Sequence, residues 1–299
     1  MGANANSIPA GLVPRVFKGL EGEPSAVIDS LPGIVSLDVT DLAGTIPTLP
    51  TSSLLSREDD AGLAEGVRAR EIDVNMGSAT YLLKRYTGFS KIPDGTRIDM
   101  DGKGAKTLEL FARLCLKQAN TKLNRRLNTV LTSTSLNQQQ VAGTAFTDAA
   151  STPIQILQSA FEKCGYGDTL ILGRDVLEAL QVHPDFIART SNFDGGAVGT
   201  GEVVNILRNV FNNLRNVYAM GHIHHYNSAT EGQTAVLAYP FDGTLWVGHA
   251  EDIVKVEQPG ANAETGRDIL SESEILRYTR RVDIVRPNQD TGCVVTGAI

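Results

Sequence analysis

The chain has 299 residues, of which 41% are hydrophobic and 20% are charged, and its formal net charge is −7 at pH 7. This is the composition of an ordinary globular protein, and the length suggests one or two domains. The overall acidity argues against a dedicated nucleic-acid reader, although not against a protein that lies beside DNA. We find no signal peptide and no run of about 18 apolar residues, so we expect a soluble, unexported protein with no membrane partner.

The three cysteines, Cys115, Cys164 and Cys293, are far apart in the sequence and form no CxxC pair. An odd number of widely spaced cysteines predicts reduced thiols in an intracellular protein. The charge is distributed unevenly: residues 1–65 carry a net −6, residues 66–102 carry +1, residues 103–131 carry +6 and residues 132–299 carry −8. The sequence therefore contains one strongly basic segment between two acidic regions.

Residues 1–65 contain half of the prolines of the chain, with frequent Gly, Ser and Thr. Prolines remove backbone donors, so regular helix or sheet is not expected there. Apolar pairs such as Val27 and Ile28 recur along the segment, which favours an extended arm ordered by lying on another surface. A disordered tail is the alternative. We expect this arm to be ordered only in an assembly, because ordering costs about 1–2 kcal/mol per residue.

Residues 66–102 alternate between polar and apolar residues and contain a Pro-Asp-Gly turn. This pattern predicts a β-hairpin, in which Tyr81 to Lys91 runs up and Thr96 to Met100 runs back. Both faces of its strands look polar, and an isolated ribbon is marginally stable in water. We interpret it as a surface hairpin or as an arm held by a neighbouring chain. The residues assigned to such an inter-subunit hairpin are Tyr81, Lys84, Lys91, Pro93, Asp94 and Gly95.

Residues 103–131 read as one long helix, because they contain no proline and only one glycine, Gly104. Apolar residues recur in steps of three or four, which is a helical period. Steps of four overshoot one turn by about 40°, so the apolar stripe winds around the helix and its two ends should face different neighbours. The stripe consists of Leu108, Phe111, Cys115, Ala119, Leu123, Leu127 and Val130.

Lys106, Arg113 and Lys117 fall within roughly 40° of one another on the helical wheel. The first half of the helix therefore has one basic face, on which something anionic is tolerated. We expect this face to point toward the inside of an assembly.

The remainder reads as a compact alternation of short helices and strands. Thr152 and Pro153 start a helix that Gly165 ends, and "DTLILG" is a short buried strand. Residues 174–180 and the region of Val203 to Phe211 read as helices. Strands are expected at residues 216–220, 234–238 and 244–247, in "RRVDIVRP" and in the closing "CVVTGAI". The segment around residues 275–278 could be a helix or a strand.

His222, His224 and His225 lie within four residues, and His222 and His224 would point to one side of a strand, as two metal ligands could. No carboxylate or cysteine stands at ligand spacing nearby, so we expect no metal here. No HExxH or GxSxG motif is present, and we assign no catalytic residue, no cofactor and no enzymatic activity. A metal-dependent hydrolase built on His222 remains the alternative of another class.

The order of arm, polar hairpin, long basic helix and compact α/β region resembles the major capsid proteins of tailed bacteriophages. This resemblance implies their α+β architecture, the Hong Kong 97 fold. The likeness is closest in "DTLILGRDVLEALQVHPDFIART", in "MGHIHHYNSATEGQ" and in the ending "GCVVTGAI". It implies an N-arm at residues 1–65, an E-loop at 66–102, a spine helix with the start of the peripheral domain at 103–149, an axial domain at 150–235 and C-terminal strands at 236–299 that return to the peripheral domain.

The resemblance implies a protein that self-assembles into hexamers and pentamers of an icosahedral phage head around double-stranded DNA, built in the host cytoplasm. The chain begins at Met1 with about 65 residues before the hairpin, so we expect a separate scaffolding protein and a portal as further partners. An encapsulin-type cellular shell is the alternative with the same fold. Its discriminating feature would be a shorter N-terminus that binds cargo.

Overall fold

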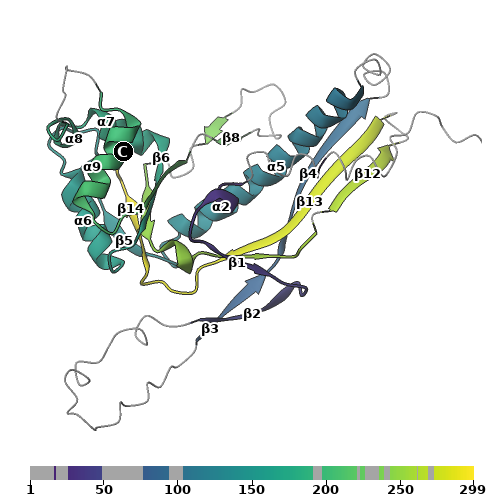
Figure 1. Cartoon of the computed structure of the whole chain (residues 1–299), viewed down its shortest axis with the longest axis horizontal. Coiled ribbons are helices and arrows are strands. Elements are labelled where there is room, and N and C mark those ends of the chain that lie inside the picture. Colours follow the sequence, from purple (N-terminus) through teal and green to yellow (C-terminus); the bar gives the residue numbers. More distant parts are fainter. Residues whose placement is uncertain are drawn as a thin grey trace, which may run out of the picture.

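The computed structural model describes residues 17, 26–48, 77–93, 104–190, 197–220, 223–225, 236–238, 243–260, 262–268 and 273–299. They form two lobes, each built on a five-stranded sheet, with a two-stranded ribbon at the junction (Figure 1). The mixture of helices and strands confirms the predicted α+β class. Among the helices of this described part, none has the length and apolar character needed to cross a membrane.

The first sheet is organised around the long strand β13 (Ser273–Val285). Strand β4 (Lys84–Pro93) runs antiparallel along one side of β13. The other side of β13 pairs with β12 (Asn262–Asp268) and β11 (Val254–Glu257). Strand β1 (Val35–Asp38) adds to β11 in parallel and ends the sheet. The segment that could have been helix or strand around 275–278 is therefore the middle of this strand.

Helix α5 (Gly104–Thr132) lies against β4 and β13 and confirms the predicted long helix (Figure 1). Its two ends do pack on different neighbours, as the winding stripe indicated. Leu108, Cys115 and Ala119 join a cluster with Ile92 and Leu276 of the first sheet. The second half instead enters a cluster that spans both lobes, made by Leu123, Leu127, Val130 and Leu131 with Ile28, Ile171, Trp246 and Ile284.

The free edge of β4 is covered by side chains of α5. Gln118 Oε1 accepts a hydrogen bond from the backbone N–H of Phe89 at 3.1 Å. One turn later, Lys122 Nζ donates to the carbonyl of Thr87 at 2.6 Å. An uncovered strand edge is a template for unwanted pairing, and these two bonds occupy part of it.

The expectation that residues 1–65 lack regular structure is wrong for residues 26–48, whereas order that depends on an assembly stays a prediction. This stretch forms helix α2 (Val27–Ser30), strand β1 and strand β2 (Ala43–Thr48) within the single chain. Ala26, Ile28 and Leu31 are buried in the cluster that spans the two lobes. The apolar pairs of this segment therefore have partners inside the subunit, which offset the cost of ordering it.

Four charged side chains attach α2 to the first sheet. Asp29 forms ion pairs with Lys255 at 2.9 Å and with Arg280 at 2.7 Å. Glu257 pairs with the same two cations, at 3.0 Å from Lys255 and 2.9 Å from Arg280. Their side chains are only 10–18% exposed, so the network is shielded from most of the solvent. We call these four residues the ionic latch.

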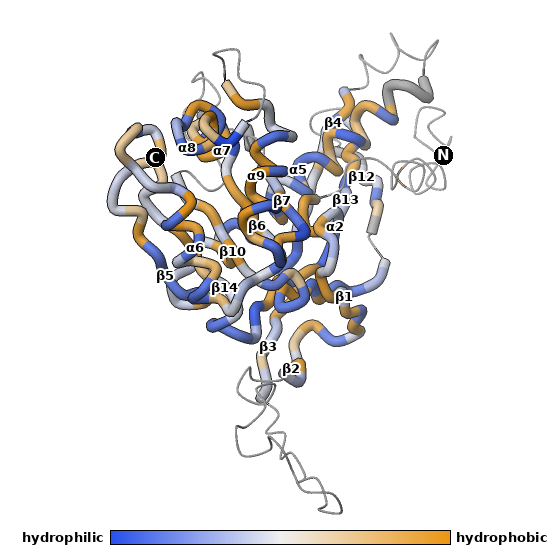
Figure 2. The backbone as a smooth tube through the Cα atoms, turned by 60° about the vertical axis from the view of Figure 1, so that its left-hand side comes forward, coloured by the Kyte–Doolittle hydropathy of each residue, from blue (hydrophilic) through white to orange (hydrophobic). Residues whose placement is uncertain are grey.

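The second sheet has the order β5, β14, β10, β6, β7. Its centre is fully buried, since every residue of β6 (Thr169–Gly173) and β10 (Leu245–Gly248) is buried, and Figure 2 shows the hydrophobic colour along β6. Four helices pack around it: α6 (Pro153–Lys163), α7 (Arg174–Val182), α8 (Pro184–Ile187) and α9 (Thr200–Val210). The helices predicted to start at Pro153 and Arg174 and the strand "DTLILG" are confirmed.

The resemblance implied that the C-terminal strands return to the first sheet, but some of them belong to the second sheet. Strand β10 pairs with β6, and β14 (Gly292–Thr296) lies between β10 and β5 (Gln138–Val141). Among the described C-terminal strands, β11, β12 and β13 join the first sheet. The reason is apolar content: all four residues of β10 and four of the five in β14 are buried, which suits the centre of the second lobe.

The predicted first strand of the hairpin, residues 81–91, is divided between β3 (Gly77–Leu82) and β4. Strand β4 pairs with β13, and β3 pairs with β2. Asp94, Gly95 and the predicted return strand lie outside the described residues, so the hairpin turn stays a prediction. The strands are not polar on both faces, because Tyr81, Tyr86 and Ile92 are buried. The two-stranded ribbon of this protein is therefore β2–β3, and residues 49–76 connect its strands. A further short pair joins β8 (Ile223–His225) and β9 (Val236–Ala238).

Asn137, which is 1% exposed, links the end of α5 to the second sheet. Its amide nitrogen donates to the carbonyls of Val130 at 3.0 Å and Ser133 at 2.8 Å. Its amide oxygen accepts from Trp246 Nε1 at 2.8 Å. The guanidinium of Arg286 lies 5.3 Å above the ring of the same tryptophan. One polar side chain thus caps the helix and fixes the central indole between the lobes.

Candidate functional site

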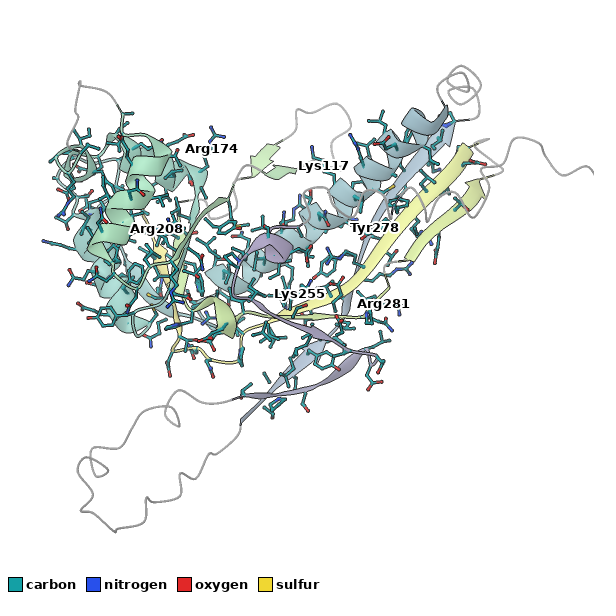
Figure 3. All side chains as sticks on the ribbon, in the orientation of Figure 1. Lys117, Arg174, Arg208, Lys255, Tyr278 and Arg281 are labelled. Atoms are coloured by element: carbon teal, nitrogen blue, oxygen red, sulfur yellow. The ribbon has the colours of Figure 1, made fainter. Side chains whose placement is uncertain are left out.

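The predicted basic face lies on the exposed side of α5. Arg113 and Lys117 are exposed, and Figure 3 shows Lys117 on the side of the helix away from β13. Lys106 belongs to the same helix, but its side chain lies outside the described part. Arg113 also forms an ion pair with Glu109 at 2.7 Å, one turn earlier. The positive charge of this face is therefore partly balanced within the helix. Its direction inside an assembly stays a prediction.

Two leucines share this face, which the sequence reasoning missed. Leu110 is 53% exposed and Leu114 is 43% exposed, and their spacing of four places them one above the other. The signal was in the sequence, since a helical wheel sets both beside Lys117 and opposite the apolar stripe. An exposed apolar pair among cations suits contact with a protein more than contact with phosphates alone.

The residues assigned to an inter-subunit hairpin are separated by the structure. Tyr81 is 8% exposed and packs with Ile46 and Leu83 under the ribbon. Lys84 and Lys91 are exposed at opposite ends of β4, and Pro93 ends that strand. Tyr81 is thus a core residue of the subunit. Participation of the exposed lysines in an interface remains a prediction.

The face of the first sheet that points away from α5 carries a shallow groove of about 440 Å³. Its lining alternates along β4 and β13, because every second residue of a strand points to the same side. The lining residues are Arg85, Thr87, Phe89, Lys91, Ile275 and Arg277. We call this the sheet-face groove.

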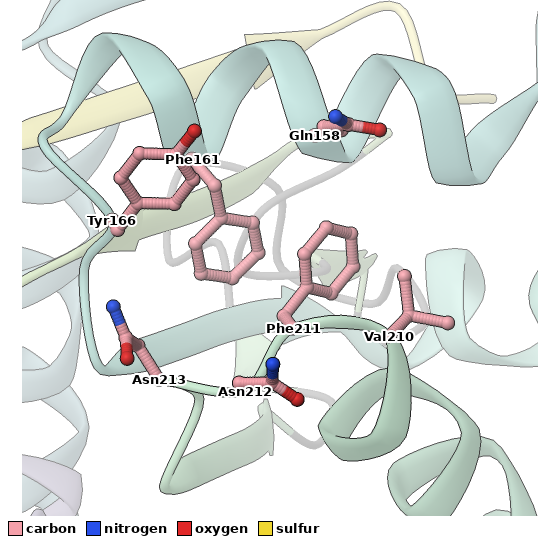
Figure 4. Close-up of a pocket in the computed structure, with 7 residues that line it drawn as sticks. All are labelled: Gln158, Phe161, Tyr166, Val210, Phe211, Asn212 and Asn213. Atoms are coloured by element: carbon pink, nitrogen blue, oxygen red, sulfur yellow. The ribbon is translucent and has the colours of Figure 1, made fainter.

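A second groove, of about 410 Å³, lies in the second lobe beside the ends of α6 and α9 (Figure 4). The rings of Phe161 and Phe211 form a stacked pair with centroids 4.4 Å apart. Tyr166, also in the lining, is 53% exposed and has a φ of 59°, a left-handed backbone conformation that is unusual for a non-glycine residue. No carboxylate, histidine or cysteine lines this groove, so it offers no group for acid–base or nucleophilic chemistry.

His183 and Ser151 form the pair closest in appearance to a nucleophile and its base. The backbone N–H of Asp185 donates to His183 Nδ1 at 3.1 Å, so the proton of the ring is on Nε2. Nε2 lies 3.0 Å from Ser151 Oγ and 3.2 Å from the carbonyl of Asp148. A protonated Nε2 cannot accept the serine proton, and both side chains are buried. This pair therefore supports the fold.

His222 lies outside the described residues, and the side chains of His224 and His225 on β8 do as well. Within the described residues, no group of three or more His, Cys, Asp or Glu side chains could hold a metal ion. The expectation that His222, His224 and His225 bind no metal stays a prediction.

The three cysteines are free and buried. Burial raises the pKa of the Cys115 thiol to about 12 and that of Cys293 to about 11, and it also raises the pKa of Cys164. The thiolate is the reactive form, so these side chains act as small apolar residues near neutral pH.

No family model matches the sequence, and no curated protein matches it either. The fold, however, matches solved structures over nearly the whole chain. A phage-related protein from Bordetella bronchiseptica RB50 superposes with a TM-score of 0.64 at 12% identity, covering 99% of each chain. A virus-like particle from Pyrococcus furiosus gives 0.55 at 8% identity, covering 95% of this chain and 97% of the other.

The mature capsid of bacteriophage PhiM1 gives a TM-score of 0.52 at 14% identity, covering 99% of this chain and 91% of the other. At such identities the likeness concerns the fold alone. The predicted resemblance is confirmed at that level: in fold, this chain resembles phage capsid proteins along its full length.

Proposed function

We propose that this chain is a phage major capsid protein, which assembles into hexamers and pentamers of an icosahedral head around double-stranded DNA. The observation that carries the proposal is the match to the mature capsid of bacteriophage PhiM1 over 99% of this chain and 91% of the other. A partial match could come from one shared domain, whereas this one includes both sheets, the long helix and the ribbon. The proposed role is structural, and we assign it no catalysis.

The exposed surface supports self-association. Large apolar side chains are exposed at well separated places: Leu82 near the ribbon, Phe89 in the sheet-face groove, Leu110 and Leu114 on α5, and Val141 and Val182 in the second lobe. Of these, Leu110 and Leu114 lie together on α5 and suit contact with another subunit, whereas the others are single side chains. Closed rings and shells require such distinct head-to-tail contacts.

Within this proposal, α5 is the spine helix, the first lobe is the peripheral domain and the second lobe is the axial domain. The β2–β3 ribbon takes the place of the E-loop, which shifts that element from residues 66–102 to residues 43–82. The basic face of Lys106, Arg113 and Lys117 would look into the shell toward packaged DNA. A separate scaffolding protein and a portal would assist assembly in the host cytoplasm.

Negative-stain electron microscopy and sedimentation velocity of the purified protein test the proposal. We expect megadalton closed particles. A protein that remains monomeric over a wide range of concentration, salt and crowding, also with the other head proteins of its source present, would contradict it. Nuclease-resistant double-stranded DNA inside particles from the natural source would support the phage role.

An encapsulin-type shell is the second candidate, and the match to the Pyrococcus furiosus virus-like particle favours it specifically. The content of the particle separates the two functions. Shells that contain a defined protein cargo and no nuclease-resistant DNA would replace the first proposal with the second.

A further inference from the structure

The groove beside the ends of α6 and α9 has an aromatic floor between two rims of amide side chains. Gln158 stands on the α6 rim, and Asn212 and Asn213 stand on the opposite rim (Figure 4). The stacked rings of Phe161 and Phe211 lie between the rims. Both phenylalanines are buried, so the floor is shallow. The groove therefore presents a flat aromatic surface with polar groups on two sides.

Tyr166 supplies the exposed ring of this groove. Its left-handed backbone conformation costs less for glycine or asparagine than for tyrosine. The chain on either side fixes this conformation: the N–H of Tyr166 donates to the carbonyl of Phe161 at 2.7 Å, and a Cβ atom on Gly167 would overlap with the backbone of Gly248. A tyrosine that is strained, held in place and 53% exposed contributes little to the core, which indicates a role at the surface.

The turn that carries the two asparagines is fixed as well. The N–H of Leu214 donates to the carbonyl of Phe211 at 2.9 Å and closes the turn. Phe211 and Leu214 are buried, whereas Asn212 and Asn213 between them are exposed. Within the part of the chain that the structure describes, neither asparagine side chain makes a hydrogen bond. The two amides are thus held at fixed backbone positions and are available to a ligand.

The chemistry of the lining restricts the ligand. No charged side chain lines the groove, and Glu162, which follows on α6, accepts a hydrogen bond from the amide of Gln158 at 3.2 Å. Phosphate and carboxylate ligands bind most strongly where arginine or lysine is present. The side chains that anchor a protein partner need well-packed, desolvated pockets, which a shallow floor does not offer. The lining therefore disfavours nucleic acids, charged peptides and protein anchors.

A carbohydrate matches the remaining chemistry. A pyranose ring has an apolar C–H face, which can pack on an aromatic ring, and a rim of hydroxyl groups that donate and accept hydrogen bonds. Asparagine and glutamine amides also donate and accept. The volume of about 410 Å³ lies within the usual range of small-molecule sites, roughly 300–1,000 Å³. We propose that this groove binds a neutral glycan, with one sugar ring on Tyr166 and its hydroxyl groups at the amides of the two rims.

Binding of neutral oligosaccharides to the full-length chain tests the proposal. It needs no assembly, because the groove belongs to one subunit. The probes are maltotriose, cellotriose, chitotriose and mannotriose, and saturation-transfer NMR detects which sugar protons contact the protein. We expect at least one of these sugars to bind saturably at millimolar concentration or below, with the strongest transfer to the C–H protons of one ring. Absence of binding by all of them would overturn the proposal.

Two variants locate the binding on this groove. Tyr166→Gly removes the ring and relieves the backbone strain, so it should keep the melting temperature of the unmodified protein and lower the affinity for the sugar at least about tenfold. Asn212→Ala with Asn213→Ala, at exposed positions, should lower the affinity to a similar extent. Phe89→Ala removes a ring of similar exposure, 52%, from the first lobe and is the matched control. Unchanged affinity in Tyr166→Gly, or an equal loss in Phe89→Ala, would refute the site.

Competition separates a glycan from the other ligand classes. Single-stranded oligothymidylate and decaproline are titrated into the complex with the sugar, because base stacking and proline-rich peptides also use aromatic surfaces. We expect neither to displace the sugar, and we expect its affinity to be the same in low and high salt, since no charge takes part. Displacement by either competitor at a lower concentration than that of the sugar would overturn the glycan assignment. Sugar binding without shells, or shells without sugar binding, would decide this inference and the proposed function separately.

Discussion

Gly88 of β4 crosses the backbone of Cys115 in α5 so closely that a Cβ atom on Gly88 would overlap with the Cys115 carbonyl oxygen. The obstacle is helix backbone, which cannot move aside as a flexible side chain can. The absence of a side chain at this position therefore sets how closely the long helix approaches the first sheet.

We expect Gly88→Ala to destabilise the subunit by about 3 kcal/mol, at the upper end of overpacking costs, because helix and strand must separate. Gly201→Ala in α9 is the control, since no atom lies within 4 Å of the added Cβ there. The control should stabilise slightly, by about 0.5–1 kcal/mol. Chemical denaturation of both variants measures this, and equal stability of the two would refute the close approach.

The ionic latch predicts a defined pH dependence. Burial pushes the pKa of Asp29 upward, but hydrogen bonds and charges from Arg280 and Lys255 outweigh it and hold the pKa below its ordinary value. A lowered carboxyl pKa stabilises the fold above the unfolded pKa, and this contribution is lost as the pH falls through the folded pKa. Burial lowers the pKa of Lys255, while its bonds to Asp29 and Glu257 raise it overall. The stabilisation that Lys255 contributes is lost only as the pH rises through its raised pKa.

Asp29→Asn should therefore lower the free energy of unfolding by about 2 kcal/mol or more near pH 7. The difference from the unmodified protein should be constant between roughly pH 5 and 9 and should shrink below about pH 4. Glu178→Gln is the control, because its ion pair with Arg174 is more than half exposed and contributes little. If the stability difference between Asp29→Asn and the unmodified protein were already lost at pH 6, the lowered pKa assigned to Asp29 would be contradicted.

Asn137→Ala should leave the indole N–H of Trp246 and two carbonyls at the end of α5 without their partner. Unsatisfied buried groups cost about 1–3 kcal/mol each, so we expect a loss of about 3 kcal/mol or more. Trp246 is the only tryptophan of the chain, and its fluorescence follows unfolding without a label. Ser135→Ala, at an exposed position of the same loop, should change stability by less than about 0.5 kcal/mol.

The buried thiols predict slow labelling of the folded protein and fast labelling of the unfolded protein. At pH 8 the folded protein should react with thiol reagents far more slowly than a small free thiol, because burial both blocks access and raises the pKa of all three cysteines. After unfolding in denaturant, three thiols per chain should react at once. Rapid reaction of one thiol in the native protein would show that its packing opens locally.

The local pattern of the sequence predicted those elements whose contacts follow the period of a single helix or strand. The winding of the apolar stripe from Leu108 to Val130 correctly indicated two different neighbours for α5, because helical geometry alone determines where those side chains point. The partner of β4 could not be found in this way. The partner residues, Ser273 to Val282, are 180 to 198 positions away in the sequence, and an adjacent turn signal favoured a local hairpin instead.

The candidate surfaces also differ in whether a local sequence pattern can predict them. Lys106, Arg113 and Lys117 form a face of one helix and were predicted from their spacing. The sheet-face groove combines Arg85 and Phe89 with Ile275 and Arg277, and only the register of two distant strands brings these residues together. The ionic latch likewise joins Asp29 to Arg280 across most of the chain. Interactions of this range are set by topology and have no signature in a local stretch of sequence.

The position of β14 has a consequence for synthesis on the ribosome. Strand β5 at Gln138–Val141 needs residues 293–296 as its partner, and β14 also supplies one neighbour of β10. The second lobe therefore cannot close while those residues are still being translated, even though α6 and α7 are made long before. Under the proposed function, a growing chain would remain unfit to join its neighbours until nearly the whole subunit has been made, which would separate the timing of translation from that of shell growth.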